Sequence, residues 1–267
     1  MKTYLTLSAI ALAAAATLSS GAMAQTAPAP DFTVTGNFGV TSDYRFRGIS
    51  QNNLDPAFQG GFDVAHKSGV YLGTWGSNVS QWAASTTGSL EMDLYGGYKT
   101  EVAGVGVDVG AIAYKYPGTT ASWRSNTEEA YVALAYGPAV FKTSYVLSKN
   151  YFASYGSNNR GTMYYDLTLS QEIAPKLVAS IHAGYTDYKK DGETAVNGKF
   201  SYADYNIGLA YDMGNGFTVA AKYFWNDVKP GTKYWADASG AGSNSTAMGG
   251  PNNLYKDGVA VSLTKAF

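Results

Sequence analysis

The end of the chain, residues 258–267, alternates between two kinds of side chain. One phase is small or polar, and the other is apolar except at Lys265 and consists of Val259, Val261, Leu263 and Phe267. A period of two residues is the signature of a β-strand whose two faces meet different surroundings. A strand of this kind that ends on an aromatic residue is typical of the last strand of a membrane-spanning β-barrel. The apolar phase would then face lipid and the other phase a lumen.

The start of the chain has the anatomy of a secretory signal peptide. Lys2 precedes the apolar run 5–18, and Ala22-Met23-Ala24 supplies an A-x-A cleavage site. The apolar run is shorter than the roughly 20 residues of a spanning helix, so cleavage is favoured over a membrane anchor. No later segment reaches that length, which argues against a helical membrane protein. We therefore expect a signal peptide at 1–24, a short periplasmic tail at 25–30 and a barrel at 31–267.

The composition excludes several classes of protein. The chain has no cysteine, so disulfide scaffolds and metal sites built on cysteine are absent. Its formal net charge of −1 offers no basic surface for nucleic acid. Charged residues make up only 15% of the chain, whereas soluble domains carry about 25%. Low charge with 14% aromatic residues fits an outer surface that meets hydrocarbon.

Short alternating segments with turn residues between them fill the rest of the chain, as in all-β transmembrane barrels of the antiparallel up-and-down type. The first is 31–47, in which Phe32, Val34, Phe38, Tyr44 and Phe46 share one phase and polar residues share the other. The further predicted strands are 57–66, 69–79, 89–99, 105–116, 128–136, 140–148, 162–171, 177–187, 201–212, 217–226 and 255–267. The total is about twelve, an even number as bacterial barrels require.

The connections between these segments alternate in length. The short ones are 66–69, 100–104, 137–139, 172–176 and 213–216, and the long ones include 80–88, 117–127, 149–161, 188–200 and 227–254. Short periplasmic turns alternating with long outer loops are typical of outer-membrane barrels, and they put both termini on the periplasmic side. The longest connection, 227–254, is either a surface loop or one that folds inward to narrow a pore.

Aromatic residues in the apolar phases gather at the predicted strand ends. Those near the periplasmic ends are Phe32, Tyr98, Tyr136, Tyr211, Phe217 and Phe267, and those near the outer ends are Tyr44, Phe46, Tyr185, Tyr223, Trp225 and Tyr255. Aliphatic residues and glycine fill the strand middles. Two aromatic girdles around an aliphatic band are expected of a surface that faces lipid.

Charged residues in the opposite phases are candidates for the lumen. A lysine or arginine that faces lipid at mid-membrane costs about 2–4 kcal/mol, so charges in the strands should point inward. The candidate lumen or constriction residues are Arg45, Arg47, Glu91, Asp93, Glu129, Lys142, Asp166, His182, Asp204 and Lys222. Both signs occur, which fits either a transverse field across a water-filled constriction or salt bridges that seal a narrow barrel.

Several stretches carry a resemblance to a known family. The stretch 41–50, Thr-Ser-Asp-Tyr-Arg-Phe-Arg-Gly-Ile-Ser, is similar to the start of the TorF-like porins of proteobacteria, and 55–63, 68–79 and 91–98 continue the similarity. The specific part covers about residues 31–98. The resemblance implies a Gram-negative outer-membrane location and a channel, and it brings no catalytic residues.

An enzyme is the competing class, since some outer-membrane barrels are hydrolases. The only histidines are His66, in a predicted turn, and His182, within a strand, and neither belongs to a nucleophile motif. No phosphate loop, dinucleotide fingerprint or metal motif occurs, so we expect no enzyme, cofactor or metal. The expected partners are outer-membrane lipids, the barrel-assembly machinery through Phe267, and small hydrophilic solutes. The expected function is transport by passive diffusion, with a sealed structural or adhesive barrel as the alternative and a barrel hydrolase behind it.

Overall fold

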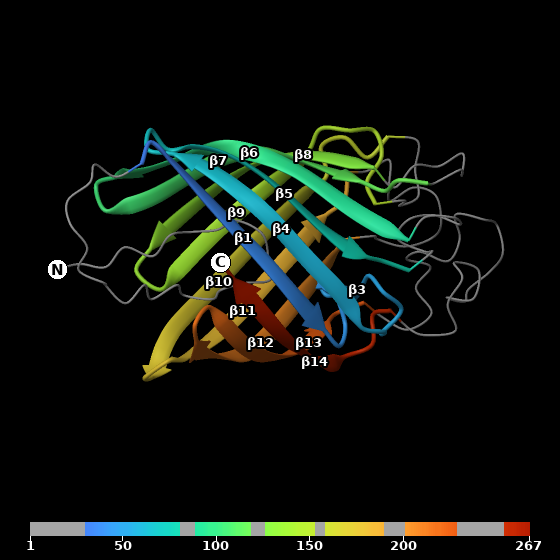
Figure 1. The fold of residues 1–267 in the computed structure, drawn as a ribbon. Helices are drawn as coiled ribbons and strands as arrows, with labels where there is room; N and C mark the ends of the chain where they lie inside the picture. The colour runs from blue at the N-terminus through green and yellow to red at the C-terminus, as the bar shows by residue number, and fades with distance from the viewer. Residues whose placement is uncertain (1–29, 81–88, 119–125, 153–157, 190–200, 229–253) are drawn as a thin grey trace.

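The computed structural model describes residues 30–80, 89–118, 126–152, 158–189, 201–228 and 254–267. These residues form a closed antiparallel β-barrel of twelve strands, which confirms the predicted fold class (Figure 1). The expected signal peptide, all of the expected tail except Pro30, and residues 229–253 of the longest connection lie outside the described residues. In the described ranges, no helix is long and apolar enough to cross a membrane.

Each barrel strand pairs with its neighbours in the chain, and the first strand closes the barrel against the last. The strands of the wall are β1 (Phe32–Thr41), β4 (Ala57–His66), β5 (Val70–Asn78), β6 (Leu90–Val102), β7 (Val105–Lys115), β8 (Thr127–Tyr136), β9 (Ala139–Val146), β10 (Met163–Ala174), β11 (Leu177–Asp187), β12 (Tyr202–Gly214), β13 (Phe217–Asn226) and β14 (Gly258–Ala266). Eleven of the twelve predicted segments agree with a wall strand to within a few residues.

The two ends of the barrel differ in how they connect the strands. One end, called the turn end, carries the short connections 67–69, 103–104, 137–138, 175–176 and 215–216. Asn215 and Gly216 have φ of 52° and 78°, the type I′ geometry that matches the twist of two paired strands. All other connections leave from the opposite end, called the loop end, so the predicted alternation of short and long connections is confirmed.

The outer surface of the wall is apolar. Large exposed side chains line its aliphatic band, for example Leu72, Leu94, Ile181, Leu209 and Val261. The aromatic residues predicted at the turn end are all exposed there: Phe32, Tyr98, Tyr136, Tyr211, Phe217 and Phe267. In β8, adjacent residues take opposite faces, so Glu129 is buried inside while Glu128 lies outside and pairs with Lys115. The lipid-facing and inward phases are therefore assigned correctly for these strands.

The first predicted segment is wrong in its second half. β1 ends at Thr41, and residues 42–56, called the plug, turn into the barrel instead of continuing along the wall (Figure 1). Tyr44, predicted to face lipid, is only 3% exposed, and Phe46 and Tyr255, predicted likewise, pack against the interior cluster. A spanning strand needs about 9–11 residues, so the segment 31–47 is longer than the membrane requires.

The last residue helps to close the barrel. Phe267 exchanges two backbone hydrogen bonds with Gly36, of 2.8 and 3.0 Å, and its ring lies against Phe62 on the outer surface. Lys265, the polar exception in the lipid-facing phase, donates to the carbonyl of Asn215 at the turn end and lies over the ring of Phe217. Its ammonium group thus leaves the hydrocarbon by reaching the turn, as expected of a lysine near a strand end.

Gly36 leaves the space that the Phe267 ring occupies, because a Cβ at Gly36 would lie 2.6 Å from Cε2 of that ring. We expect Gly36→Ala to lower the free energy of unfolding by about 1–3 kcal/mol, the usual cost of overpacking. Chemical unfolding in lipid vesicles measures this change. The control is Ala111→Val on the outward face of β7, which should change stability by less than about 0.5 kcal/mol. Equal effects of both variants would contradict a role of this contact in closure.

Candidate functional site

The plug fills the loop-end half of the barrel interior with a small hairpin. Its strands are β2 (Arg45–Phe46) and β3 (Ile49–Ser50). Arg47 and Gly48 form the two-residue turn, with φ of 48° and 77°, as in a type I′ hairpin. The plug leaves the wall after Thr41 and returns at Ala57, two residues that pair directly in the sheet. It is therefore an insertion at one point of the wall.

Arg47, at the tip of the hairpin, joins the plug to the far wall. Its guanidinium donates to both carboxylate oxygens of Glu129 on β8, at 2.9 and 2.7 Å, and to the Tyr151 hydroxyl at 2.7 Å. It also lies over the ring of Tyr164 on β10, 4.2 Å from the centroid. Burial opposes the charge, but Glu129 outweighs it and holds the pKa of Arg47 above its usual value. Arg47 is therefore a charged anchor with a two-pronged bond.

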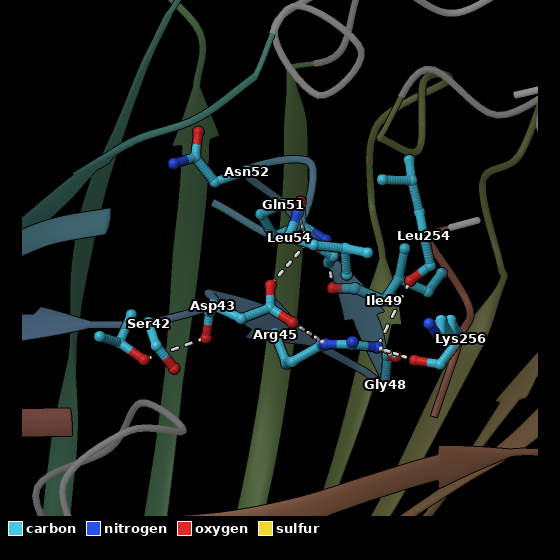
Figure 2. A network of polar contacts seen from close by, with 12 residues as sticks. Ser42, Asp43, Arg45, Gly48, Ile49, Gln51, Asn52, Leu54, Leu254 and Lys256 are labelled. Carbon is cyan, nitrogen blue, oxygen red and sulfur yellow. Dashed lines mark hydrogen bonds and ion pairs between the residues drawn. The ribbon is translucent and has the colours of Figure 1, made fainter. Parts of the chain in front are cut away.

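Arg45 fixes the base of the hairpin (Figure 2). Its Nε lies 2.5 Å from Oδ2 of Asp43, and its Nη1 donates to the carbonyls of Gly48 and Lys256, at 3.2 and 2.8 Å. The other oxygen of Asp43 accepts from the Ser50 hydroxyl at 2.6 Å. These contacts lie within the plug and between the plug and the segment before β14, so Arg45 holds the plug to that segment.

The wall strand β6 presents two carboxylates to the plug. Glu91 accepts hydrogen bonds from the hydroxyls of Tyr44 and Tyr116, at 2.8 and 2.7 Å. Burial and the nearby Glu91 raise the pKa of Tyr44, which keeps this phenol a neutral donor. Asp93 is 1% exposed, and its Oδ1 has no hydrogen-bond partner among the described residues. The Tyr44 hydroxyl of the plug thus donates a hydrogen bond to Glu91, whereas one oxygen of Asp93 has no donor among the described residues.

Aromatic packing completes the filling of this half. Phe46 lies edge-on to Tyr114 and to Phe152, with ring centroids 5.6 and 5.0 Å apart, and Tyr44 lies edge-on to Trp75. A small cavity beside the hairpin encloses about 20 Å³, room for about one water molecule. The plug and these rings thus pack together inside the loop-end half of the barrel.

His182, Asp166 and Asp204 come together on β10, β11 and β12. The imidazole places Nε2 3.1 Å from Asp204 and Nδ1 3.4 Å from Asp166. The hydroxyl of Thr168 lies 3.2 Å from Nδ1, which resembles a nucleophile beside a base. With carboxylates at both ring nitrogens, however, the imidazole has no free nitrogen to accept a proton from Thr168. Within the described chain, no cluster of three or more metal-ligating side chains is arranged to hold an ion.

The middle of the wall and the turn-end half of the interior carry further charges. Lys142 lies over the ring of Tyr131, 4.1 Å from the centroid, and Lys222 is half-buried on β13. The charged residues here that were not among the predicted candidates include Asp63, Asp108 and Lys99. Asp63 and Asp108 accept from the hydroxyls of Tyr95 and Tyr71, and Lys99 lies 4.0 Å from Asp108.

The sequence held a signal for only some of these additions. Asp63 shares the inward phase of its strand with Gln59, so the alternation indicated its position. Asp108 lies in a segment whose two phases are both apolar, which hid its facing. The ten predicted candidates all lie inside the barrel, but at different levels. Glu91, Asp93 and Glu129 surround the plug, which contains Arg45 and Arg47. Lys142, His182 and Lys222 lie near the middle of their strands, and Asp166 and Asp204 lie toward the loop end of β10 and β12.

Solved structures share this architecture. The NanC porin has a TM-score of 0.50 at 12% identity over 88% of this chain and 99% of that one. A KdgM porin in complex with disordered oligogalacturonate reaches 0.48 at 6% identity over 88% and 98%. Outer membrane phospholipase A from Escherichia coli reaches 0.43 at 12% identity over 87% and 91%. The likeness to NanC shows the fold, a barrel resembling those of bacterial outer-membrane proteins.

The amino-acid sequence assigns the chain to a family, which the similarity of folds does not. No match was found among curated proteins. Residues 24–267 match a family described as "Bacterial protein of unknown function (Gcw_chp)", and this match spans the entire barrel. The chain therefore belongs to the Gcw_chp family.

Proposed function

We propose that the protein is exported to the outer membrane of Gram-negative bacteria and acts there as a channel for small hydrophilic solutes. The plug closes the channel in the conformation described here. The observation that carries the proposal is that the interior is charged and that ion pairs and hydrogen bonds hold the plug in it. Ion pairs and hydrogen bonds can exchange for water, whereas a continuous apolar core could not open at similar cost. The fold shared with the NanC porin agrees with this function.

The turn-end half supports a route for solutes. This half and the middle of the wall present charges of both signs to the interior, Asp63 and Asp108 opposing Lys99, Lys142 and Lys222. Mixed charges around an aqueous lumen set up a transverse field that orders water and sorts ions. With the turn end on the periplasmic side, this half forms a vestibule below the plug. Solutes reach it from outside when the plug moves.

A sealed structural or adhesive barrel is the second candidate, and one observation favours it. Arg47 and Glu129 are 7% and 1% exposed, so their pair is shielded from the solvent that would help to separate it. Planar-bilayer recording separates the two functions. We expect wild-type protein to show discrete, infrequent openings. Absence of openings in wild-type protein and in a plug-less variant would establish the sealed barrel.

The lumen lysines give a test of the route itself. We expect Lys142→Gln with Lys222→Gln to shift selectivity toward cations, because the double variant removes two positive charges from the vestibule and leaves its carboxylates. The reversal potential under a potassium chloride gradient measures this change. Lys265→Gln removes a lysine from the outer surface and should leave the potential unchanged. A double variant with wild-type selectivity would place the conduction route elsewhere.

A further inference from the structure

The outer surface of β9 to β12 carries aromatic side chains near the loop end, and Tyr223 and Trp225 continue them on β13, whereas β5 to β8 carry none there. Tyr145, Tyr165, Tyr185 and Tyr205 occupy outward positions on these four consecutive strands. The corresponding positions of β5 to β8 carry aliphatic, small or polar residues: Gly76, Asn78, Leu90, Met92, Ala113, Lys115, Glu128 and Ala130. An aromatic girdle that only anchors a barrel should run around it. The one-sided cluster therefore requires a further explanation.

A depression lies among these tyrosines. Tyr185 pairs with Tyr165 on one side and with Ala203 on the other, and Ala183 pairs with Tyr205. The two alanines leave an open hollow of about 290 Å³, which Phe141 and Leu167 also line. The hollow faces the lipid, and its walls are apolar and aromatic. It has the shape and chemistry to hold a hydrocarbon chain.

Three cations border this face at the loop end. Lys149, Arg160 and Lys189 are exposed, and none forms an ion pair with another described residue. Their segments meet: the amide of Asn159 donates to the carbonyl of Lys149 at 2.8 Å, and the amide of Lys189 donates to the Thr162 hydroxyl at 3.3 Å.

The cations adjoin the aromatic row directly. A Cβ at Gly161 would lie 3.4 Å from the Tyr145 hydroxyl and 3.5 Å from Cδ of Lys189, so both side chains flank the same backbone position. Asp187 is the exposed carboxylate at the end of β11, and Asp227 is engaged by the amide of Ala203. Among the described residues of this face, three cations thus stand against two carboxylates.

We propose that this face binds a phosphorylated membrane lipid, with an acyl chain in the depression and the phosphate headgroup on Lys149, Arg160 and Lys189. The bilayer is already as apolar as the depression, so the chain alone gains little by entering it. Selection must come from the headgroup, for which arginine offers paired donors and lysine a point charge. The proposal rests on the proposed function only for its orientation, which puts the loop end in the outer leaflet.

A second copy of the chain fits this face less well. In a twofold dimer the same patch meets itself, so the three cations of one copy would approach those of the other. Like charges at close range disfavour such a contact. A lipid phosphate instead supplies the opposite charge, and the tyrosine hydroxyls lie where headgroups meet hydrocarbon.

Native mass spectrometry of protein released from nanodiscs tests the proposal. The discs contain phosphatidylcholine with a minor fraction of bisphosphorylated lipid A, or of the same lipid with its phosphates removed. We expect wild-type protein to retain the phosphorylated form only. Replacing Lys149, Arg160 and Lys189 together by glutamine should weaken its retention about a hundredfold, because each basic residue near an anionic surface contributes about a factor of five.

A second variant probes the depression separately. Ala183→Trp fills the hollow while keeping the cations, and it should also abolish retention. Lys115→Gln and Ala111→Trp make the same kinds of change on β7 and should retain lipid as wild type does. Inorganic phosphate should not displace the lipid. Equal retention of both lipids, unchanged retention by the triple variant, or lipid-free dimers would overturn the proposal. The readout needs no conductance, so a sealed barrel would leave it intact.

Discussion

A variant without the plug is expected to form the same barrel and to conduct continuously. Thr41 and Ala57 pair in the wall, so the plug can be removed between them without shifting any strand. Replacing residues 43–55 by Asn-Gly leaves the four-residue loop Ser42-Asn-Gly-Pro56, a length that hairpins use readily. Ser42 also keeps its hydrogen bonds to Val261. The interior then loses Arg45, Arg47 and the aromatic filling, and the lumen becomes continuous with its vestibule.

Two measurements on this plug-less variant decide the result. Heat-modifiable gel migration shows whether the barrel has formed, and planar-bilayer recording shows whether it conducts. We expect long-lived open steps in place of the infrequent openings of wild-type protein. The control replaces Ile49 alone by valine, which keeps the hairpin and should keep the wild-type trace. A folded plug-less barrel without conductance would refute the channel and leave the structural barrel as the function.

The wall of the barrel could be predicted because lipid imposes a rule on every second residue. Val259, Val261 and Leu263 face hydrocarbon, and a charge in their places would cost about 2–4 kcal/mol at mid-membrane. The pattern therefore repeats in each strand and also marks the exception at Lys265. The ends of these strands could also be predicted, because a pair such as Asn215-Gly216 indicates a tight turn from the local sequence alone.

The plug could not be recognised from the same rule, because apolar and polar residues alternate at its start as they do in a wall strand. Tyr44 and Phe46 continue the phase of Phe38, yet they pack against aromatic residues inside the barrel. Two signals were present: the length of 31–47, and Gly48, a residue type that readily adopts the positive φ of a tight turn. Neither says whether such a hairpin extends outward or folds inward. That choice depends on partners far away in the sequence.

The partners of the interior charges were also beyond the sequence. The inward phase identified Glu129, but only the closed wall brings it to Arg47, 82 positions earlier in the chain. In the same way, His182 meets Asp166 and Asp204 because three neighbouring strands are in register. The alternation of residues predicts whether a side chain points into the barrel. Which side chain it meets on a distant strand depends on the register of all the strands between.

Arg47→Ala should destabilise the protein and release the plug. The variant leaves Glu129 buried without its partner, and removing one member of a buried ion pair costs about 3–5 kcal/mol. We therefore expect the free energy of unfolding in lipid vesicles to fall by about this amount. The hairpin tip also loses its contacts to Tyr151 and Tyr164, so openings in planar bilayers should become more frequent. Adding Glu129→Gln should restore part of the stability, because it removes the stranded charge, but not the closed state.

The matched control breaks an ion pair on the outer surface of the barrel, where Glu128 takes the opposite face of β8 from Glu129. Lys115→Ala breaks the exposed pair with Glu128, whose partners are 39% and 52% exposed, and such a pair is worth about 0–1 kcal/mol. If Arg47→Ala were no more costly than Lys115→Ala, the Arg47–Glu129 pair would not be the anchor of the plug. If it were costly but left the openings unchanged, Arg47 would stabilise the barrel without closing it. Only lower stability together with more frequent opening assigns the closed state to this one contact, since the plug then gives way where its tip is held.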